Sequence, residues 1–169
     1  MIPSFWRRIP SRWQAAVLRH GLNWFPAYRA TGARVVSISP DLRCVVVRLP
    51  LRRNTRNGAG TLFGGSLYSA TDPIYALMLA VHLGPDYIVW DKAAAIRYRK
   101  PGREALTAEF TLTDAEIAAV RAEVARHGAC DRTYSTCFVD AQGVVHTEVE
   151  KTVYVAGKQH YKTRVVRGD

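Results

Sequence analysis

Residues 62–83 form a mostly apolar stretch in which Asp72 is the one charged side chain. From Ile74 to Val81, apolar residues occupy every face of a helical wheel, so a helix here must be buried on all sides. A helix of this kind needs a curved sheet large enough to surround it. A chain of 169 residues has room for one domain with such a core.

The segments around this helix carry the Val-rich or alternating patterns of strands. Six strands are expected, at residues 33–39, 43–49, 87–99, 105–113, 133–140 and 144–157. Residues 114–128 predict an inserted helix that starts near Asp114 and ends before Gly128. Because every strand connection suits antiparallel pairing, the sequence predicts an α+β fold, with a curved antiparallel sheet wrapped round a long central helix.

Two shorter segments flank the expected main domain. Residues 1–29 contain an amphipathic helix that begins after Pro10, residues 30–157 form the main domain, and residues 158–169 form a basic C-terminal tail. We expect the N-terminal helix to pack on the main domain.

Basic charge is concentrated in the first third of the chain. Residues 1–60 hold eleven Arg and one Asp, whereas the remaining residues balance to zero, which gives the net charge of +10. A basic region of this kind can face nucleic acid, an anionic membrane or a phosphate-bearing ligand, or it can be an ordinary solvated surface. No nucleic-acid-binding motif accompanies it, so we expect no nucleic-acid partner. Trp6, Trp13 and Trp24 beside Arg residues could touch a membrane surface, but we expect this helix to pack on the main domain and expect no membrane contact.

Several classes of protein find no support in the sequence. No uncharged apolar run reaches the roughly 18 residues of a membrane span, and the N-terminus lacks the pattern of a signal peptide. A cytoplasmic location is therefore expected. The three Cys and five His show no metal-binding spacing, so neither a metal site nor a disulfide framework is expected.

Asp72 followed by Pro73 admits two interpretations. Asp and then Pro suit the N-cap and the first position of a helix that begins there. If the helix begins near Gly65 instead, Pro73 lies about two turns inside it, kinks it and leaves the Ser69 carbonyl without its usual donor. Such a conflict is tolerated where function benefits, and capping does not explain the Gly64-Gly65 pair.

Residues 57–72, NGAGTLFGGSLYSATD, resemble the signature of small acyl-CoA thioesterases of the phenylacetyl-CoA type, which have the hotdog fold. That signature reads approximately N-x-x-G-x-x-H-G-G, with an Asp seven residues after the last Gly, as in this sequence. The matching positions are Asn57, Gly60, Gly64, Gly65 and Asp72, and Phe63 stands at the His position. Residues 86–103 and 150–157 resemble an uncharacterised bacterial branch of the superfamily, and the whole resemblance covers residues 30–157.

The resemblance implies hydrolysis of an acyl thioester to a free acid and coenzyme A. Coenzyme A is part of the substrate, and no cofactor is expected. It implies that the Gly64 N–H stabilises the oxyanion, that Asp72 is the base or nucleophile, and that Asn57 orients water or the carbonyl. Phe63 and Gly65 would contact the substrate. The candidate phosphate contacts are Arg52, Arg53, Arg56, Arg97, Arg99, Lys100 and Arg103. It also implies a homodimer or homotetramer, with the glycine and the acid supplied by opposite subunits.

Several of these residues have a structural alternative. Asn57-Gly58 is a common turn pair, and any single basic residue can serve to keep a strand edge solvated. Phe63 removes a polar group beside the expected thioester. The sequence therefore leaves a second function open, that of a non-catalytic acyl-CoA or fatty-acyl binding protein of the same fold. It also leaves the carrier open between coenzyme A and an acyl carrier protein.

Overall fold

The computed structural model describes residues 9–167, so Trp6 lies outside the described part of the chain. The helices are α1 (Ser11–Trp24), α2 (Pro26–Ala30), α3 (Gly64–Ser69), α4 (Ile74–Leu83), α5 (Asp114–His127) and α6 (Lys158–Arg167). The strands are β1 (Arg34–Ile38), β2 (Cys44–Leu49), β3 (Tyr87–Tyr98), β4 (Leu106–Thr111), β5 (Ala129–Val139) and β6 (Val145–Gly157).

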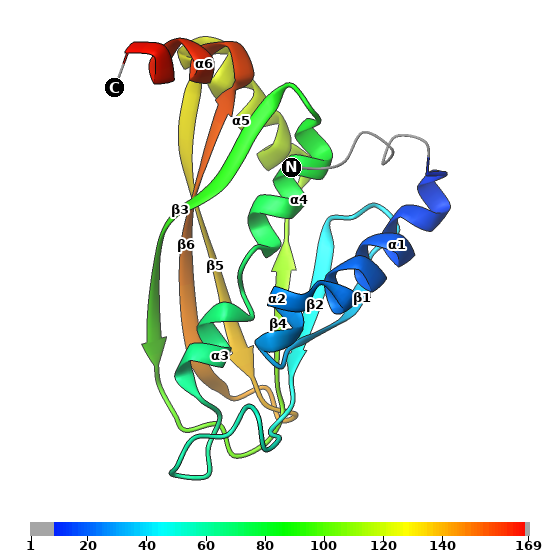
Figure 1. Cartoon of the computed structure of the whole chain (residues 1–169), viewed down its shortest axis with the longest axis vertical. Coiled ribbons are helices and arrows are strands. Elements are labelled where there is room, and N and C mark those ends of the chain that lie inside the picture. The colour runs from blue at the N-terminus through cyan, green and yellow to red at the C-terminus, as the bar shows by residue number, and fades with distance from the viewer. Residues whose placement is uncertain (1–8, 168–169) are drawn as a thin grey trace.

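The six strands form one antiparallel sheet in the order β1-β2-β4-β5-β6-β3. The sheet curves around α3 and α4, which lie along its inner face, while α1 and α2 lie beside β1 (Figure 1). The expected α+β architecture, with a six-stranded antiparallel sheet wrapped round central helices, is confirmed. Strands β1 and β3 are the two edges of the sheet.

Helix α4 supplies the centre of the core, because apolar side chains leave it in every direction. Its buried residues are Ile74, Tyr75, Ala76, Met78, Leu79 and Leu83. The Tyr75 ring meets Phe110 of β4 edge-on at 5.2 Å and stacks on Tyr134 of β5 at 4.7 Å. Its hydroxyl donates to the Ser135 carbonyl at 2.9 Å. Most of α4 is thus buried against the sheet, whereas Leu77, Ala80, Val81 and His82 are only partly buried, so the expected burial on every side is not complete.

The central helix is interrupted at the residues that the sequence singles out. Helix α3 begins at Gly64 and ends at Ser69, α4 begins at Ile74, and the Asp72–Pro73 peptide bond between them is cis. Pro73 has no N–H, so the Ser69 carbonyl lacks its usual donor as expected, and it accepts a hydrogen bond from the Asp72 N–H instead, at 3.2 Å. The expected single long helix is therefore two helices, with Asp72 in the turn between them.

The N-terminal helix forms where the sequence predicts it. Asn23 in its last turn bonds both backbone groups of Val35 in β1, each at 2.9 Å, and this pair of bonds fixes α1 to the edge of the sheet. Helix α2 was not anticipated. Residues 158–167, expected as a basic tail, form α6.

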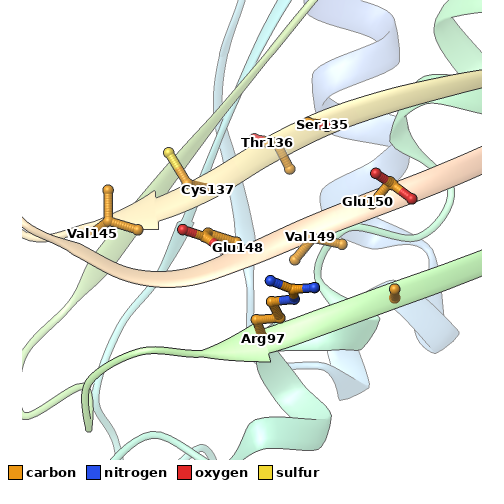
Figure 2. Close-up of a pocket in the computed structure, with 9 residues that line it drawn as sticks. Arg97, Ser135, Thr136, Cys137, Val145, Glu148, Val149 and Glu150 are labelled. Atoms are coloured by element: carbon orange, nitrogen blue, oxygen red, sulfur yellow. The ribbon is translucent and has the colours of Figure 1, made fainter.

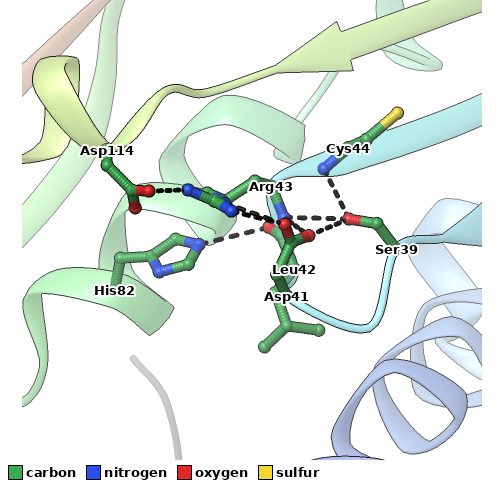
Figure 3. Close-up of polar contacts among 7 residues, drawn as sticks. All are labelled: Ser39, Asp41, Leu42, Arg43, Cys44, His82 and Asp114. Atoms are coloured by element: carbon green, nitrogen blue, oxygen red, sulfur yellow. Dashed lines mark hydrogen bonds and ion pairs between the residues drawn. The ribbon is translucent and has the colours of Figure 1, made fainter.

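A polar network holds the β1–β2 turn against the ends of two helices (Figure 3). Arg43 pairs with Asp41 at 2.7 Å and also with Asp114 at the start of α5. His82 in the last turn of α4 donates to the Leu42 carbonyl at 3.3 Å. Hydrogen bonds from Ser39 and Arg43 hold the pKa of the Asp41 carboxyl well below its usual range. We regard this network as structural, because its groups bond one another within the turn or join the turn to α4 and α5.

Candidate functional site

Asp72 does not cap the helix that follows it. Pro73 is the N-cap residue of α4, and no side chain bonds the free N–H groups there. The Asp72 side chain is 57% exposed and lines a groove of about 650 Å³ on the surface formed by α2 and α3. Of the two interpretations of Asp72, capping is therefore excluded by the geometry.

The groove is mainly apolar, with Asp72 as its one ionisable carboxyl. It is lined by Phe25, Ala27, Tyr28, Ala30, Thr31, Phe63, Gly65, Ser66, Tyr68, Ser69, Asp72 and Pro73. The α2 wall carries the small side chains Ala27 and Ala30. A mainly apolar cleft with a few hydroxyl groups and one carboxylate suits a ligand with a hydrocarbon body and a polar reactive end.

Lys151 of β6 lies beneath Asp72 and is the largest charged side chain in the core, at 1% exposure. Its Nζ donates to Asp72 Oδ1 at 3.5 Å and lies 2.7 Å from Asp91 Oδ2. The same Nζ lies 5.6 Å from the centre of the Tyr68 ring. A buried ammonium needs compensating charge, and the two carboxylates supply it.

A β-bulge in β3 is the reason that Asp91 faces inward. Ala94 and Ile96 pair with Lys151 and Val149 of β6, whose side chains face inward, so Ala94 and Ile96 face inward too. With strict alternation along β3, residue 92 would face inward and residue 91 outward. The register shifts between Asp91 and Ala93, which leaves Lys92 as the extra residue and turns Asp91 toward Lys151. Lys92 points outward and pairs with Asp131 at 2.6 Å.

The pKa of the Asp91 carboxyl is raised by its surroundings. Burial raises the pKa of its carboxyl to about 6, the Asp72 carboxyl contributes in the same direction, and the Lys151 ammonium opposes them. Its contact with Lys151 lacks the alignment of a hydrogen bond, so both carboxyl oxygens are buried without a hydrogen-bond partner among the described residues. Sequence reasoning gave Asp91 no role and did not consider Lys151.

Gly64 and Gly65 begin α3 as expected, and both positions are crowded. A Cβ on Gly64 would lie 2.8 Å from the Tyr98 hydroxyl, which donates to the Gly64 carbonyl at 3.0 Å. A Cβ on Gly65 would collide with the exposed Phe63 ring. A side chain at Gly64 or Gly65 would therefore have to displace an aromatic ring that is itself exposed.

Asn57 lies away from the groove, in the loop before α3. Its Oδ1 accepts from the N–H groups of Ala59 and Thr61, each at 3.1 Å, and its Nδ2 donates to Thr61 Oγ1 at 3.0 Å. These contacts shape the loop as an Asx turn. The structure does not bring Asn57 together with Asp72, and its role in positioning substrate stays a prediction.

The predicted phosphate-binding residues gather on two loops at one end of the sheet. The Leu62 N–H donates to the Gly102 carbonyl at 2.8 Å, which joins the loop before α3 to the loop after β3. Exposed on these loops are Arg52, Arg53, Arg56, Arg99, Lys100 and Arg103, and Arg99 also pairs with Glu148 at 2.8 Å. The basic group therefore adjoins the start of α3 without lining the groove itself.

A second cavity, of about 560 Å³, is lined by residues of β3, β5 and β6 on the outer face of the sheet (Figure 2). Glu148 and Glu150 alternate with the buried Val149 and Lys151 along β6, and Arg97 of β3 stands beside Glu148. Arg97 thus belongs to this outer surface and not to the basic loops. Residues 9–167 contain no cluster of His, Cys, Asp or Glu suited to a metal ion, and no helix among them is long and apolar enough to span a membrane.

Comparison with solved structures supports this architecture. A Pseudomonas aeruginosa protein described as of unknown function and a probable thioesterase aligns with a TM-score of 0.74 at 19% identity, over 88% of this chain and 97% of that one. A Haemophilus influenzae thioesterase gives 0.63 at 15% identity, over 83% and 88% of the two chains. The PaaI protein from the phenylacetic acid degradation operon of Escherichia coli gives 0.57 at 18% identity, over 87% and 94%.

At these identities the likeness establishes the hotdog fold. No curated protein matches the sequence. One family model matches residues 14–155, a range that contains the groove, Asp91 and Lys151. The chain therefore belongs to the DUF4442 family, a domain of unknown function.

Proposed function

We propose that this protein is an acyl-CoA thioesterase that uses Asp72 to activate water. The observation that carries the proposal is the position of Asp72, which combines an exposed carboxylate at an apolar groove with a buried charge pair behind it. The hotdog fold shared with proteins described as thioesterases is in keeping with this activity.

The reaction requires one proton acceptor and one group that stabilises the oxyanion. Asp72 takes a proton from water while the water oxygen bonds to the thioester carbonyl carbon. The carbonyl oxygen becomes an oxyanion, for which the Gly64 N–H at the start of α3 is the proposed donor. The C–S bond then breaks, the free acid forms, and the leaving thiolate takes the proton from Asp72.

Lys151 and Asp91 prepare Asp72 for this role. The Lys151 Nζ donates to Asp72 Oδ1 at 3.5 Å and thereby orients this carboxylate at the groove. Its own buried position is stabilised by Asp91. The basic residues on the loops next to α3 would bind the phosphates of coenzyme A.

We further propose a homodimer that forms through the free edge of β3. This strand has 12 residues and pairs on one side only, with β6, so its other edge can pair with a second copy. In such a dimer Gly64 of one subunit and Asp72 of the other would act on the same substrate.

The proposal is tested by release of free thiol from a panel of acyl-CoA esters of different chain length. Wild type should release coenzyme A, and Asp72→Asn should lose this activity while keeping its fold. Asp86→Asn is the matched control, because Asp86 is an exposed aspartate in the turn after α4. No turnover on the whole panel, or equal loss in both variants, would contradict the proposal.

A further inference from the structure

Helix α1 carries two apolar faces, and the sheet covers only one of them. Leu22 is buried and Leu18 half-buried against the main domain. Trp13, Val17 and Trp24 are exposed by 56%, 40% and 72%. From Trp13 to Leu22 is nine residues, or about two and a half turns, so the exposed face points away from the packed one.

The exposed face is continuous with the candidate site. Phe25 follows Trp24 directly, is itself exposed, and lines the groove that contains Asp72. The apolar surface thus extends from α1 to the mouth of the groove. Single exposed apolar residues are ordinary on a soluble surface, but two Trp and a Phe in one row mark an interaction surface.

The charged residues of the N-terminal segment that carries this face have one sign. The first 40 residues contain six Arg and no acidic residue. Arg12 and Arg29 are exposed on α1 and α2, and the Arg29 guanidinium lies 5.8 Å from the centre of the Trp24 ring. Trp with flanking Arg on an amphipathic helix is the composition that binds the interface of an anionic bilayer.

The position of α1 leaves this face accessible in the proposed dimer. Helix α1 packs on β1, at one edge of the sheet, and β3 is the opposite edge (Figure 1). A second copy paired through β3 would therefore not cover Trp13 or Val17.

From these observations we infer that the surface formed by Trp13, Val17, Trp24 and Phe25, with its neighbouring Arg residues, docks on an anionic lipid bilayer. The Trp side chains enter the headgroup region, and the Arg side chains contact lipid phosphates. This binding is independent of the proposed hydrolysis. If both hold, the groove entrance faces the bilayer, and the substrates are acyl thioesters of long chains that partition into membranes.

Sedimentation with vesicles tests the inference on the purified full-length chain. We expect binding to vesicles that mix phosphatidylcholine with phosphatidylglycerol, weaker binding to phosphatidylcholine alone, and loss of binding at high salt. Val17→Asp should weaken binding by at least about tenfold, because it places a carboxylate in the apolar face. Val36→Asp is the matched control, since Val36 is 42% exposed on β1 and takes the same change of charge.

Equal binding by the two variants, or no binding to anionic vesicles by wild type, would overturn the inference. A lower native mass for Val17→Asp than for Val36→Asp would show instead that a second copy covers this face. Because vesicle binding is measured without substrate, a failure here is distinct from a failure of the thioesterase proposal. A wild-type protein that binds anionic vesicles but hydrolyses no acyl-CoA would contradict the thioesterase proposal and leave the inference on membrane binding intact.

Discussion

At the scale of single residues, the candidate site depends on how a buried ammonium is balanced. Lys151 has two carboxylate neighbours, Asp91 at 2.7 Å and Asp72 at 3.5 Å. Removing one member of a buried ion pair leaves the other uncompensated, which costs more than the pair itself contributes. The cost depends on pH here, because Asp91 can become neutral by taking a proton.

Lys151→Met should therefore destabilise the fold by about 3 kcal/mol at pH near 8, where Asp91 is ionised. The loss should be smaller at pH near 5, where Asp91 takes a proton and needs no partner. Denaturant unfolding at both pH values measures this. Adding Asp91→Asn to Lys151→Met should restore much of the stability at the higher pH, and no restoration would argue against the pairing.

Asp91 should also give the protein a distinct dependence of stability on pH. Its pKa in the folded protein is about 6 and exceeds the ordinary value of 3.8, so the folded state holds the proton more tightly. The contribution to stability is then fully present below the ordinary pKa and is lost as the pH rises through the folded one.

Asp91→Asn removes this titration. The difference in unfolding free energy, wild type minus variant, should fall as the pH rises from about 4 to about 7. Urea unfolding across this range provides the values. A difference that is constant or that grows with pH would show that the Asp91 pKa is not raised.

At the scale of elements, α2 and α3 form the two walls of the groove. The α2 wall has room for a ligand because Ala27 and Ala30 are small. Whatever part of the substrate lies between these helices must be apolar, and its length is limited by the groove.

Ala30→Trp should fill part of the groove and act on chain-length selectivity. For a long-chain acyl-CoA, kcat/KM should fall by about tenfold or more, while a short-chain ester that does not reach α2 should be hydrolysed nearly as before. The ratio of the two kcat/KM values is the measurement. An equal fall for both esters would place the acyl chain elsewhere.

Sequence patterns predicted the elements well where periodicity decides them. The six strands, the inserted helix and the helix after Pro10 all form, because alternating and helical patterns reflect which side faces the core. The break between α3 and α4 was harder to foresee, since both a kink and a new start were compatible with Pro73. Helix α2, at five residues, is too short to show a helical period.

The candidate site was predictable only in part, for a related reason. Asp72 is visible as the one charge in an apolar stretch, and the resemblance to the thioesterase signature is what identifies Gly64 and Gly65 as candidates. The sequence carries no comparable signal for Lys151 or Asp91. Lys151 sits in a strand that alternates normally, and only the bulge at Lys92 determines that Asp91 faces inward. A bulge depends on pairing with β6, which local sequence does not encode.

At the scale of the whole molecule, the proposed dimer divides each site between two subunits. Asp72→Asn and a variant that blocks the start of α3, Gly64→Val, should each be inactive as a pure dimer. Refolding the two together at equal amounts produces mixed dimers in which one of the two sites is intact. Activity should then recover to about one quarter of the wild-type value per chain.

Mixed refolding that restores no activity would place both residues in the same subunit. A size-exclusion measurement on each variant is the control, because Gly64→Val must still form dimers for the result to count. Loss of dimers in that variant would show that the start of α3 contributes to the interface, and Phe63→Trp would then replace it as the blocking variant.

The central claim, that Asp72 performs chemistry and does not merely contact a ligand, is tested most directly by measuring binding and turnover on one variant. For Asp72→Asn we predict that affinity for an acyl-CoA, by calorimetry, stays within about threefold of wild type. The rate of coenzyme A release should fall by about 10²- to 10⁴-fold. A variant that binds and still turns over within about tenfold of wild type would contradict the account.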